Sequence, residues 1–235
     1  MLKNKFYEVS KKDWIKSMRT GTTGIGYTFE QLLECEENSF ILPDYMNIEI
    51  KVKRRYSLGS ITLFSANPDG DYLFALDHVV DKFGYPDKDF PQFNVFRTSI
   101  CNSYKSRFKL FVSYEKEKVY MIVYKNNVVD ECIVSWSFDL IRERLYLKLS
   151  YLALVRADVK TLNGDEYFKY YSISFYKLRG FNTFLKLIEF GVIRITFKVG
   201  IIKKGQNVGK RISRGTSFDI NIDSLLLLFE EINNV

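Results

Sequence analysis

The segment from Asn47 to Lys53 alternates strictly between apolar and charged residues. Because side chains of a β-strand point alternately to its two faces, this pattern predicts a strand whose apolar face consists of Ile48, Ile50 and Val52. The charged residues then share the opposite face, with neighbours about 7 Å apart: Glu49, Lys51 and Lys53. The apolar face can pack on a core, so the segment belongs to a folded domain.

The composition is that of an ordinary globular chain. Its 235 residues are 46% hydrophobic and 16% aromatic, which excludes a disordered protein. No run of about 18 uncharged apolar residues predicts a membrane span, and the first residues do not resemble a secretory signal. Three cysteines lie far apart, a pattern that favours reduced core thiols in a cytoplasmic protein over a disulfide framework or a zinc site: Cys35, Cys101 and Cys132.

Basic residues are concentrated in three places. The chain has 35 basic and 28 acidic residues, a net charge of +7. The stretch from Val192 to Gly215 holds seven basic residues and no acid, and the stretch from Phe90 to Tyr114, which includes Arg97, is also free of acids. A third cluster begins within the alternating strand and extends from Lys51 to Arg55. One such cluster is usually a solvated face, but three together favour contacts with a polyanion such as DNA.

Hydrophobic periodicity predicts helices and strands in mixed order. Helices are expected at 11–18, 27–33, 72–83, 138–148, 182–190 and 222–232. Strands are expected at 47–53, 61–64, 93–100, 108–114, 119–124, 128–135, 151–161, 170–176 and 192–199. No linker interrupts them, so we expect a single α/β domain over 1–235 with a mixed, largely antiparallel sheet flanked by helices. It could form two lobes around a DNA cleft, a catalytic lobe at about 1–135 and a recognition lobe at about 136–235.

A second carboxylate precedes the charged strand face. Asp44 follows Pro43, five residues before Glu49, and a chain reversal there would bring its carboxylate to the same end of the strand. Two converging carboxylates can hold Mg²⁺, which prefers oxygen ligands. Lys51 could then orient or deprotonate an attacking water and stabilise the transition state of phosphate hydrolysis. This is the arrangement of the PD-(D/E)XK nucleases.

The surrounding sequence resembles the MvaI/BcnI restriction endonuclease family, a MutH-like branch of these nucleases. The resemblance includes the glycine-rich turn Gly21-Thr-Thr-Gly-Ile-Gly before a helix that carries Glu30, in the pattern Glu-x13-Asp-x4-Glu-x-Lys. Both Ser60-Ile-Thr-Leu-Phe and the C-terminal Arg214-Gly-Thr-Ser-Phe-Asp-Ile are also similar to the family. One departure is that relatives tend to place histidine where this chain has Arg211 and Arg214.

The resemblance implies a Mg²⁺-dependent type II endonuclease. Such an enzyme would act as a monomer on double-stranded DNA, recognise a short CC-x-GG-like site and nick the strands sequentially. A cognate DNA methyltransferase would be expected in the same system, though not as a stable partner. Asp44 and Glu49 would bind the metal, Lys51 would serve the attacking water, and Glu30 would be a supporting acid that orients the lysine or a water on the metal.

The basic clusters supply the expected contacts with DNA. Asn or Gln can pair with adenine and Arg or Lys with guanine, so the glycine-rich C-terminal stretch is the preferred candidate for base readout. The predicted DNA-binding residues are Lys53, Arg54, Arg55, Lys198, Lys203, Lys204, Gln206, Asn207, Lys210, Arg211 and Arg214.

Two alternatives stay open at this stage. A MutH-like repair nickase would cut only one strand. A non-catalytic basic DNA-binding protein would show salt-sensitive binding without metal-dependent cleavage.

Overall fold

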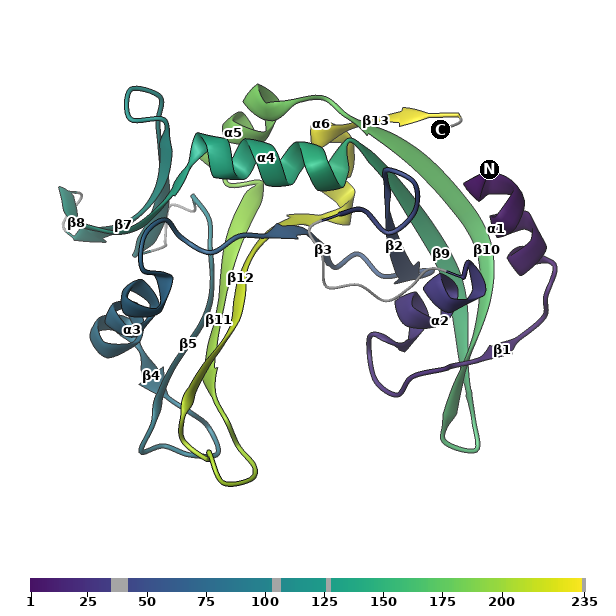
Figure 1. Cartoon of the computed structure of the whole chain (residues 1–235), viewed down its shortest axis with the longest axis horizontal. Helices are drawn as coiled ribbons and strands as arrows, with labels where there is room; N and C mark the ends of the chain where they lie inside the picture. The colour runs from purple at the N-terminus through teal and green to yellow at the C-terminus, as the bar shows by residue number, and fades with distance from the viewer. Residues whose placement is uncertain (35–41, 103–106, 126–127, 234–235) are drawn as a thin grey trace. The chain divides into compact units, whose positions relative to one another are not determined.

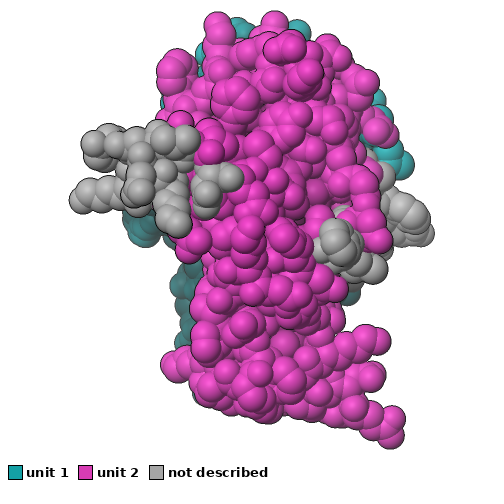
Figure 2. Space-filling model, turned by 90° about the vertical axis from the view of Figure 1, so that its left-hand side faces the viewer, with its two compact units in different colours: residues 1–59, 145–180, 225–235 teal, residues 60–144, 181–224 magenta. Residues whose placement is uncertain are grey.

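The computed structural model describes residues 1–34, 42–102, 107–125 and 128–233 (Figure 1). Contacts divide the chain into two compact units, each assembled from separate stretches (Figure 2). Unit 1 contains Met1–Gly59, Leu145–Gly180 and Leu225–Val235, and unit 2 contains Ser60–Arg144 and Phe181–Ser224. In the described part of the chain, none of the helices is long and apolar enough to span a membrane.

The sheet of unit 1 centres on a long antiparallel hairpin. Its strands β9 (Tyr151–Leu162) and β10 (Asp165–Leu178) pair along most of their length. The strand β2 (Ile48–Arg54) pairs with β9 in parallel, whereas β1 (Ile15–Lys16) and β13 (Phe229–Ile232) pair with β10 in antiparallel fashion. The predicted charged strand therefore has a long-range partner that lies about one hundred residues further along the chain.

Two helices cover the core of unit 1. The helices α1 (Leu2–Ser10) and α2 (Gly24–Leu32) contribute buried residues to the same cluster as Ile48 and Ile50 of β2. Tyr170 of β10 is buried in this cluster, and its hydroxyl donates a 2.9 Å hydrogen bond to the carbonyl of Ile25 in α2. This bond ties α2 to the sheet beneath it.

Unit 2 contains two sheets. The five-stranded sheet has the order β3 (Ser60–Ser65), β12 (Arg211–Asn221), β11 (Ile193–Ile201), β5 (Asn94–Ile100) and β4 (Tyr85–Pro86). The three-stranded sheet is formed by β6 (Phe108–Ser113), β7 (Lys118–Lys125) and β8 (Val128–Ser137). Their strand pairs are antiparallel. The helices are α3 (Tyr72–Phe83), α5 (Phe181–Glu189) and the first part of α4 (Phe138–Leu149), which ends in unit 1.

The core of unit 2 is aromatic. Trp136 is fully buried, and its ring lies edge-on to Phe197 and Phe218 at centroid distances of 6.0 and 5.8 Å. Its indole N–H donates to the carbonyl of Ala66 at 3.1 Å, which satisfies the one polar atom of the side chain.

Most predicted elements are confirmed, including the mixed α/β class and the helix at 72–83. Two predicted helices are wrong. The segment 11–18 contains no helix, because Ile15 and Lys16 extend to pair with β10. The segment 222–232 contains a 3₁₀ turn (Ile222–Ser224) and the short helix α6 (Leu225–Leu228), after which β13 joins the sheet. Arg179 contacts the end of this helix, because its Nε donates to the carbonyls of Leu226 and Phe229 at 3.3 and 3.1 Å.

The expectation of core thiols is also corrected. Cys132 is exposed and Cys101 is half-buried, and both are free, whereas Cys35 lies outside the described residues. Strand β12 was not expected from the sequence, because glycine and charged residues obscure its alternation.

We predict that Tyr170→Phe lowers the free energy of unfolding by about 1 kcal/mol, because the substitution removes one buried hydrogen bond without changing the ring. Urea denaturation followed by circular dichroism would measure this difference. Tyr56→Phe is the matched control, since Tyr56 is 86% exposed and its variant should match the parent protein. Equal stabilities of the two variants would contradict the prediction.

Candidate active site and nucleic-acid interface

A tight turn places Asp44 beside strand β2. Met46 and Asn47 have φ values of 43° and 73°, in the left-handed region, and Tyr45 pairs with Ile48 across the turn. The Oδ2 atom of Asp44 accepts a 2.8 Å hydrogen bond from the backbone N–H of Ile50. The chain reversal predicted from the sequence is therefore present, and it fixes the carboxylate of Asp44 next to the strand that carries Glu49.

The carboxylate of Glu49 is buried, with only 1% of the side chain exposed. Lys51, two residues further along the same face of β2, donates a hydrogen bond from Nζ to Oε1 of Glu49 at 2.5 Å. The apolar face of β2 packs on the core of unit 1 through Ile48 and Ile50. The strand is consequently buried on both sides at Glu49, which the alternation of charged and apolar residues did not indicate.

A second lysine reaches Glu49 from a different element. Lys148, in the last turn of α4, lies with Nζ 3.4 Å from Oε2 of Glu49. This oxygen is buried and accepts no hydrogen bond in the described structure, so the two groups form an ion pair only. Sequence reasoning missed Lys148. The only available signal was its place in a predicted helix that carries several other charged residues.

Burial and neighbouring charges shift the pKa values of Glu49 and Lys51. Burial raises the pKa of Glu49 above its usual value, although the charges of Lys51 and Lys148 oppose this shift. Burial lowers the pKa of Lys51, but the negative charges of Glu49, Asp44 and Glu30 outweigh it, so that the pKa of Lys51 lies above its usual value. With these acidic partners, Lys51 is a charged hydrogen-bond donor in the metal-free protein.

Glu30 joins this group from helix α2. Its side chain is half-buried, and its charge contributes to the raised pKa of Lys51. The structure thus brings together all four predicted catalytic residues, from a helix, a turn and one strand: Glu30, Asp44, Glu49 and Lys51.

The carboxylates of Asp44 and Glu49 are the oxygen ligands that this site offers to a metal ion. Over the described ranges, no three Asp, Glu, His or Cys side chains cluster closely enough to hold an ion by themselves. The pair of Asp44 and Glu49 nevertheless fits Mg²⁺, which typically takes one or two carboxylates and completes its shell with water. The buried Oε2 of Glu49, which accepts no hydrogen bond, is a free oxygen donor in this pair.

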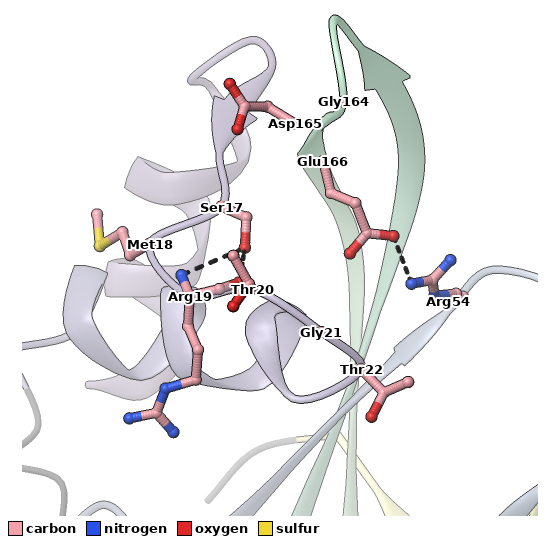
Figure 3. A pocket seen from close by; sticks show the side chains of 10 residues that line it. All are labelled: Ser17, Met18, Arg19, Thr20, Gly21, Thr22, Arg54, Gly164, Asp165 and Glu166. Atoms are coloured by element: carbon pink, nitrogen blue, oxygen red, sulfur yellow. Dashed lines mark hydrogen bonds and ion pairs between the residues drawn. The ribbon is translucent and has the colours of Figure 1, made fainter.

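At the far end of β2, the predicted DNA contacts are paired with acids. Arg54 donates to Glu166 at 2.6 Å, and Arg55 forms an ion pair with Asp158 at 3.1 Å while its guanidinium lies 3.9 Å from the ring centroid of Tyr171. Figure 3 shows Arg54 and Glu166 facing each other in a cavity of about 360 Å³, lined also by residues 17–22 and the tip of the β9–β10 hairpin. Lys53 is half-buried.

The C-terminal basic stretch forms the β11–β12 hairpin of unit 2, and acids from other segments approach part of it. Lys203 bonds Asp87 and Asp89 at 2.7 and 2.6 Å. Arg211 bonds Asp77 at 2.9 Å and also pairs with Asp81 of α3. The exposed tip of the hairpin carries the remaining predicted contacts Lys204, Gln206, Asn207 and Lys210.

Two basic residues of the same hairpin border a cavity and, in the described part of the chain, are not neutralised by an acid. Lys198 and Arg214 have no acidic partner among the described residues, and both border a cavity of about 440 Å³. The basic residues of this stretch therefore form two groups: some pair with acids from other segments, and others do not.

Comparisons with known proteins agree with this fold. The model of the MvaI/BcnI restriction endonuclease family matches residues 3–229. A solved complex of the restriction endonuclease MvaI with its cognate DNA substrate is similar with a TM-score of 0.85 and 30% identity, over 98% of this chain and 96% of that chain. MvaI in the absence of DNA is similar with a TM-score of 0.59 and 29% identity, over 98% and 95%. A search among curated protein sequences finds no match.

A mixed α/β fold with two carboxylates and a lysine around one strand is compatible with a nuclease. The match over nearly the whole chain makes the assignment specific: the chain belongs to the MvaI/BcnI restriction endonuclease family and is a type II site-specific nuclease.

We predict that Lys148→Met raises the pKa of Glu49 in the metal-free protein, because the charge of Lys148 lowers that pKa and methionine removes the charge. A carbon-13 NMR titration of the Glu49 carboxyl in EDTA would measure the change. Lys148→Arg keeps the charge and should leave the titration close to that of the parent protein. An unchanged or lower pKa in Lys148→Met would contradict the prediction.

Proposed function

We propose that this endonuclease hydrolyses phosphodiester bonds of double-stranded DNA at a short CC-x-GG-like site with Mg²⁺, as a monomer that nicks the two strands sequentially. A cognate DNA methyltransferase would protect the same site, and the enzyme would act in the cytoplasm. The observation that carries the proposal is the buried pair of Glu49 and Lys51 with Asp44 beside it. The complex of the similar MvaI with its cognate DNA supports DNA as the substrate.

The geometry supports a specific division of roles. Asp44 and Glu49 would hold the metal ion, which when bound supplies positive charge against the scissile phosphate and acidifies water. The Nζ of Lys51, charged because of its acidic neighbours, would donate a hydrogen bond to the attacking water or to a phosphate oxygen as negative charge develops there. Glu30 would hold Lys51 in this orientation and charge state.

In the reaction, the oxygen of water attacks phosphorus and the bond from phosphorus to the leaving oxygen breaks. Water gives up one proton and the leaving oxygen gains one. Because the pKa of Lys51 is raised, the lysine would support this step as a hydrogen-bond donor and counter-charge.

We expect supercoiled plasmid DNA to be cut at defined positions with Mg²⁺ and to stay intact with EDTA. Lys51→Ala and Asp44→Ala should lower the cleavage rate at least about a hundredfold, because each removes a group needed in the transition state. Lys169→Ala is the control in unit 1, since Lys169 forms its one ion pair among the described residues with Asp13. Random degradation, or normal cleavage by both active-site variants, would refute the proposal.

The order of products tests the remaining parts of the proposal. A nicked circle that appears before the linear form supports sequential cutting by a monomer, whereas synchronous cutting would indicate a dimer. A nicked circle that never becomes linear would indicate a repair nickase instead. Salt-sensitive binding without any cleavage would indicate a non-catalytic DNA-binding protein.

The β11–β12 hairpin is the proposed site of base readout, and Arg214 is its best candidate because no acid neutralises it among the described residues. We predict that Arg214→Ala weakens binding to the cleaved sequence by about 1–3 kcal/mol, the usual contribution of a two-pronged arginine–guanine contact. Fluorescence anisotropy with a labelled duplex would measure the loss. Lys116→Ala, an exposed charge of unit 2, is the control. Unchanged affinity of Arg214→Ala would remove this residue from the interface.

A further inference from the structure

Three basic residues lie in a row across neighbouring strands of unit 2. Arg97 of β5 is directly opposite Lys198 of β11 in the antiparallel register. On the other side of β11, the register shifts between Phe197 and Val199, whose partners are Thr216 and Ser213, so that Arg214 and Gly215 oppose Lys198 at a bulge. Arg97, Lys198 and Arg214 all border the cavity of about 440 Å³. We call these three residues the cation row.

Repulsion within the cation row should lower the stability of the fold. Like charges directly opposite each other on a sheet are destabilising, and β-bulges commonly redirect side chains near functional sites. Four cations border the cavity, counting Lys203, and in the described structure only two carboxylates, Asp87 and Asp89, pair with them. The cavity therefore has excess positive charge, which an anion would relieve.

The neighbouring side chains on this face are polar as well. Ser99 lies two residues after Arg97 on β5, and Thr196 lies two residues before Lys198 on β11. Their hydroxyls are 2.8 Å apart. A row of cations followed by hydroxyl groups suits DNA, because both phosphates and base edges offer several acceptors.

The guanidinium of Arg97 lies close to the backbone of β11 at Gly200. A Cβ atom at Gly200 would lie 2.5 Å from Nη2 of Arg97, so the close approach of the guanidinium requires glycine at this position. The same Nη2 atom lies 3.6 Å from Oδ2 of Asp87. The side chain is thus fixed from two sides, although nearly half of it, 48%, is exposed.

Asp87, the carboxylate that contacts Arg97, is buried and held by several donors. Its side chain is 1% exposed. Its Oδ1 accepts hydrogen bonds from Nζ of Lys203 at 2.7 Å and from the backbone N–H groups of Asp89 and Phe90 at 3.0 and 3.3 Å. These donors, with Lys203 foremost, keep the pKa of Asp87 below its usual value. The other oxygen faces Arg97, so one buried charge orients two cations of the cavity.

We propose that the cation row is a single binding site for DNA, in which Arg97 is a specificity-determining residue and Asp87 is the positioning residue that holds it. The proposal rests on the proposed function, since it assigns part of the substrate contact of the same enzyme. The fixed guanidinium presents two parallel N–H groups, which match the O6 and N7 atoms of guanine and equally two oxygens of one phosphate. Both sources share the chemistry of a paired acceptor.

The first experiment substitutes Arg97 itself. Arg97→Ala and Arg97→Lys are tested by anisotropy on a duplex with the mapped cleavage site and on a scrambled duplex, in EDTA and at several salt concentrations. We expect Kd for the cleavage-site duplex to rise about ten- to hundredfold in both variants, because lysine cannot replace a two-pronged contact. A loss confined to the cleavage-site duplex identifies a base contact. An equal loss on both duplexes, with a salt slope smaller by about one, identifies a phosphate contact and overturns the role of Arg97 in specificity.

The second experiment tests positioning by Asp87. Asp87→Asn keeps an acceptor for the backbone N–H groups but removes the charge, and Gly200→Ala displaces the guanidinium without altering Asp87. Each should raise KM about fivefold or more while the single-turnover rate at saturating DNA stays unchanged. In an Arg97→Ala background, Asp87→Asn should add less than twofold. Asp89→Asn is the control, since Asp89 contacts Lys203 but not Arg97.

The outcomes separate this proposal from the proposed function. If the parent enzyme neither binds nor cuts DNA with Mg²⁺, the proposed function fails. If the parent enzyme cuts DNA and Arg97→Ala binds with unchanged Kd, only the cation row is overturned. Additive effects of Asp87→Asn and Arg97→Ala would overturn the positioning role. Thermal melting identifies any variant that fails to fold. If Asp87→Asn does not fold, the effect of Gly200→Ala on KM tests whether the position of Arg97 matters for DNA binding.

Discussion

The burial of one carboxylate, that of Glu49, determines the organisation of unit 1. A buried charge requires compensation, and here Lys51 supplies it from the same strand and Lys148 from the end of α4. The parallel pairing of β2 with β9 fixes the strand that carries Glu49, and α4 brings Lys148 to its carboxylate. The oxygen without a hydrogen bond is the remaining imbalance of the site. The same strand therefore serves the core with its apolar face and the proposed chemistry with its charged face.

Sequence patterns predicted the fold where local preference and tertiary contact agree. The helix at Tyr72–Phe83 and the charged strand ending near Arg54 have clear periodicity, and both appear at the expected positions. The predicted helix at 222–232 is wrong because its last residues form strand β13, which pairs with β10. Arg179 donates a hydrogen bond to the carbonyl of Phe229, at the start of this strand. Pairing between segments fifty residues apart leaves no periodic signal in either segment.

The candidate site was predictable to the extent that its residues are close in sequence. Asp44, Glu49 and Lys51 lie within one turn and strand, so spacing alone indicated their convergence, whereas Glu30 came from the family resemblance. Lys148 was not predictable, since nothing in a helical segment shows which of its charges reaches a strand one hundred residues earlier. The acids that approach the C-terminal hairpin were invisible for the same reason. Asp87 and Asp77 lie more than one hundred residues from Lys203 and Arg211, which the sequence presents as an acid-free stretch.

The interleaved construction of unit 1 has a consequence for how the enzyme is made in the cell. Its sheet takes strands from the beginning, the middle and the end of the chain, in the order β2, β9, β10 and β13. During synthesis, the strand that carries Glu49 leaves the ribosome about one hundred residues before its parallel partner, so the carboxylate cannot be buried until most of the polypeptide exists. An incomplete chain would have Asp44, Glu49 and Lys51 without the surrounding core. The site of this endonuclease therefore cannot form before the strand that pairs with β2 has been synthesised.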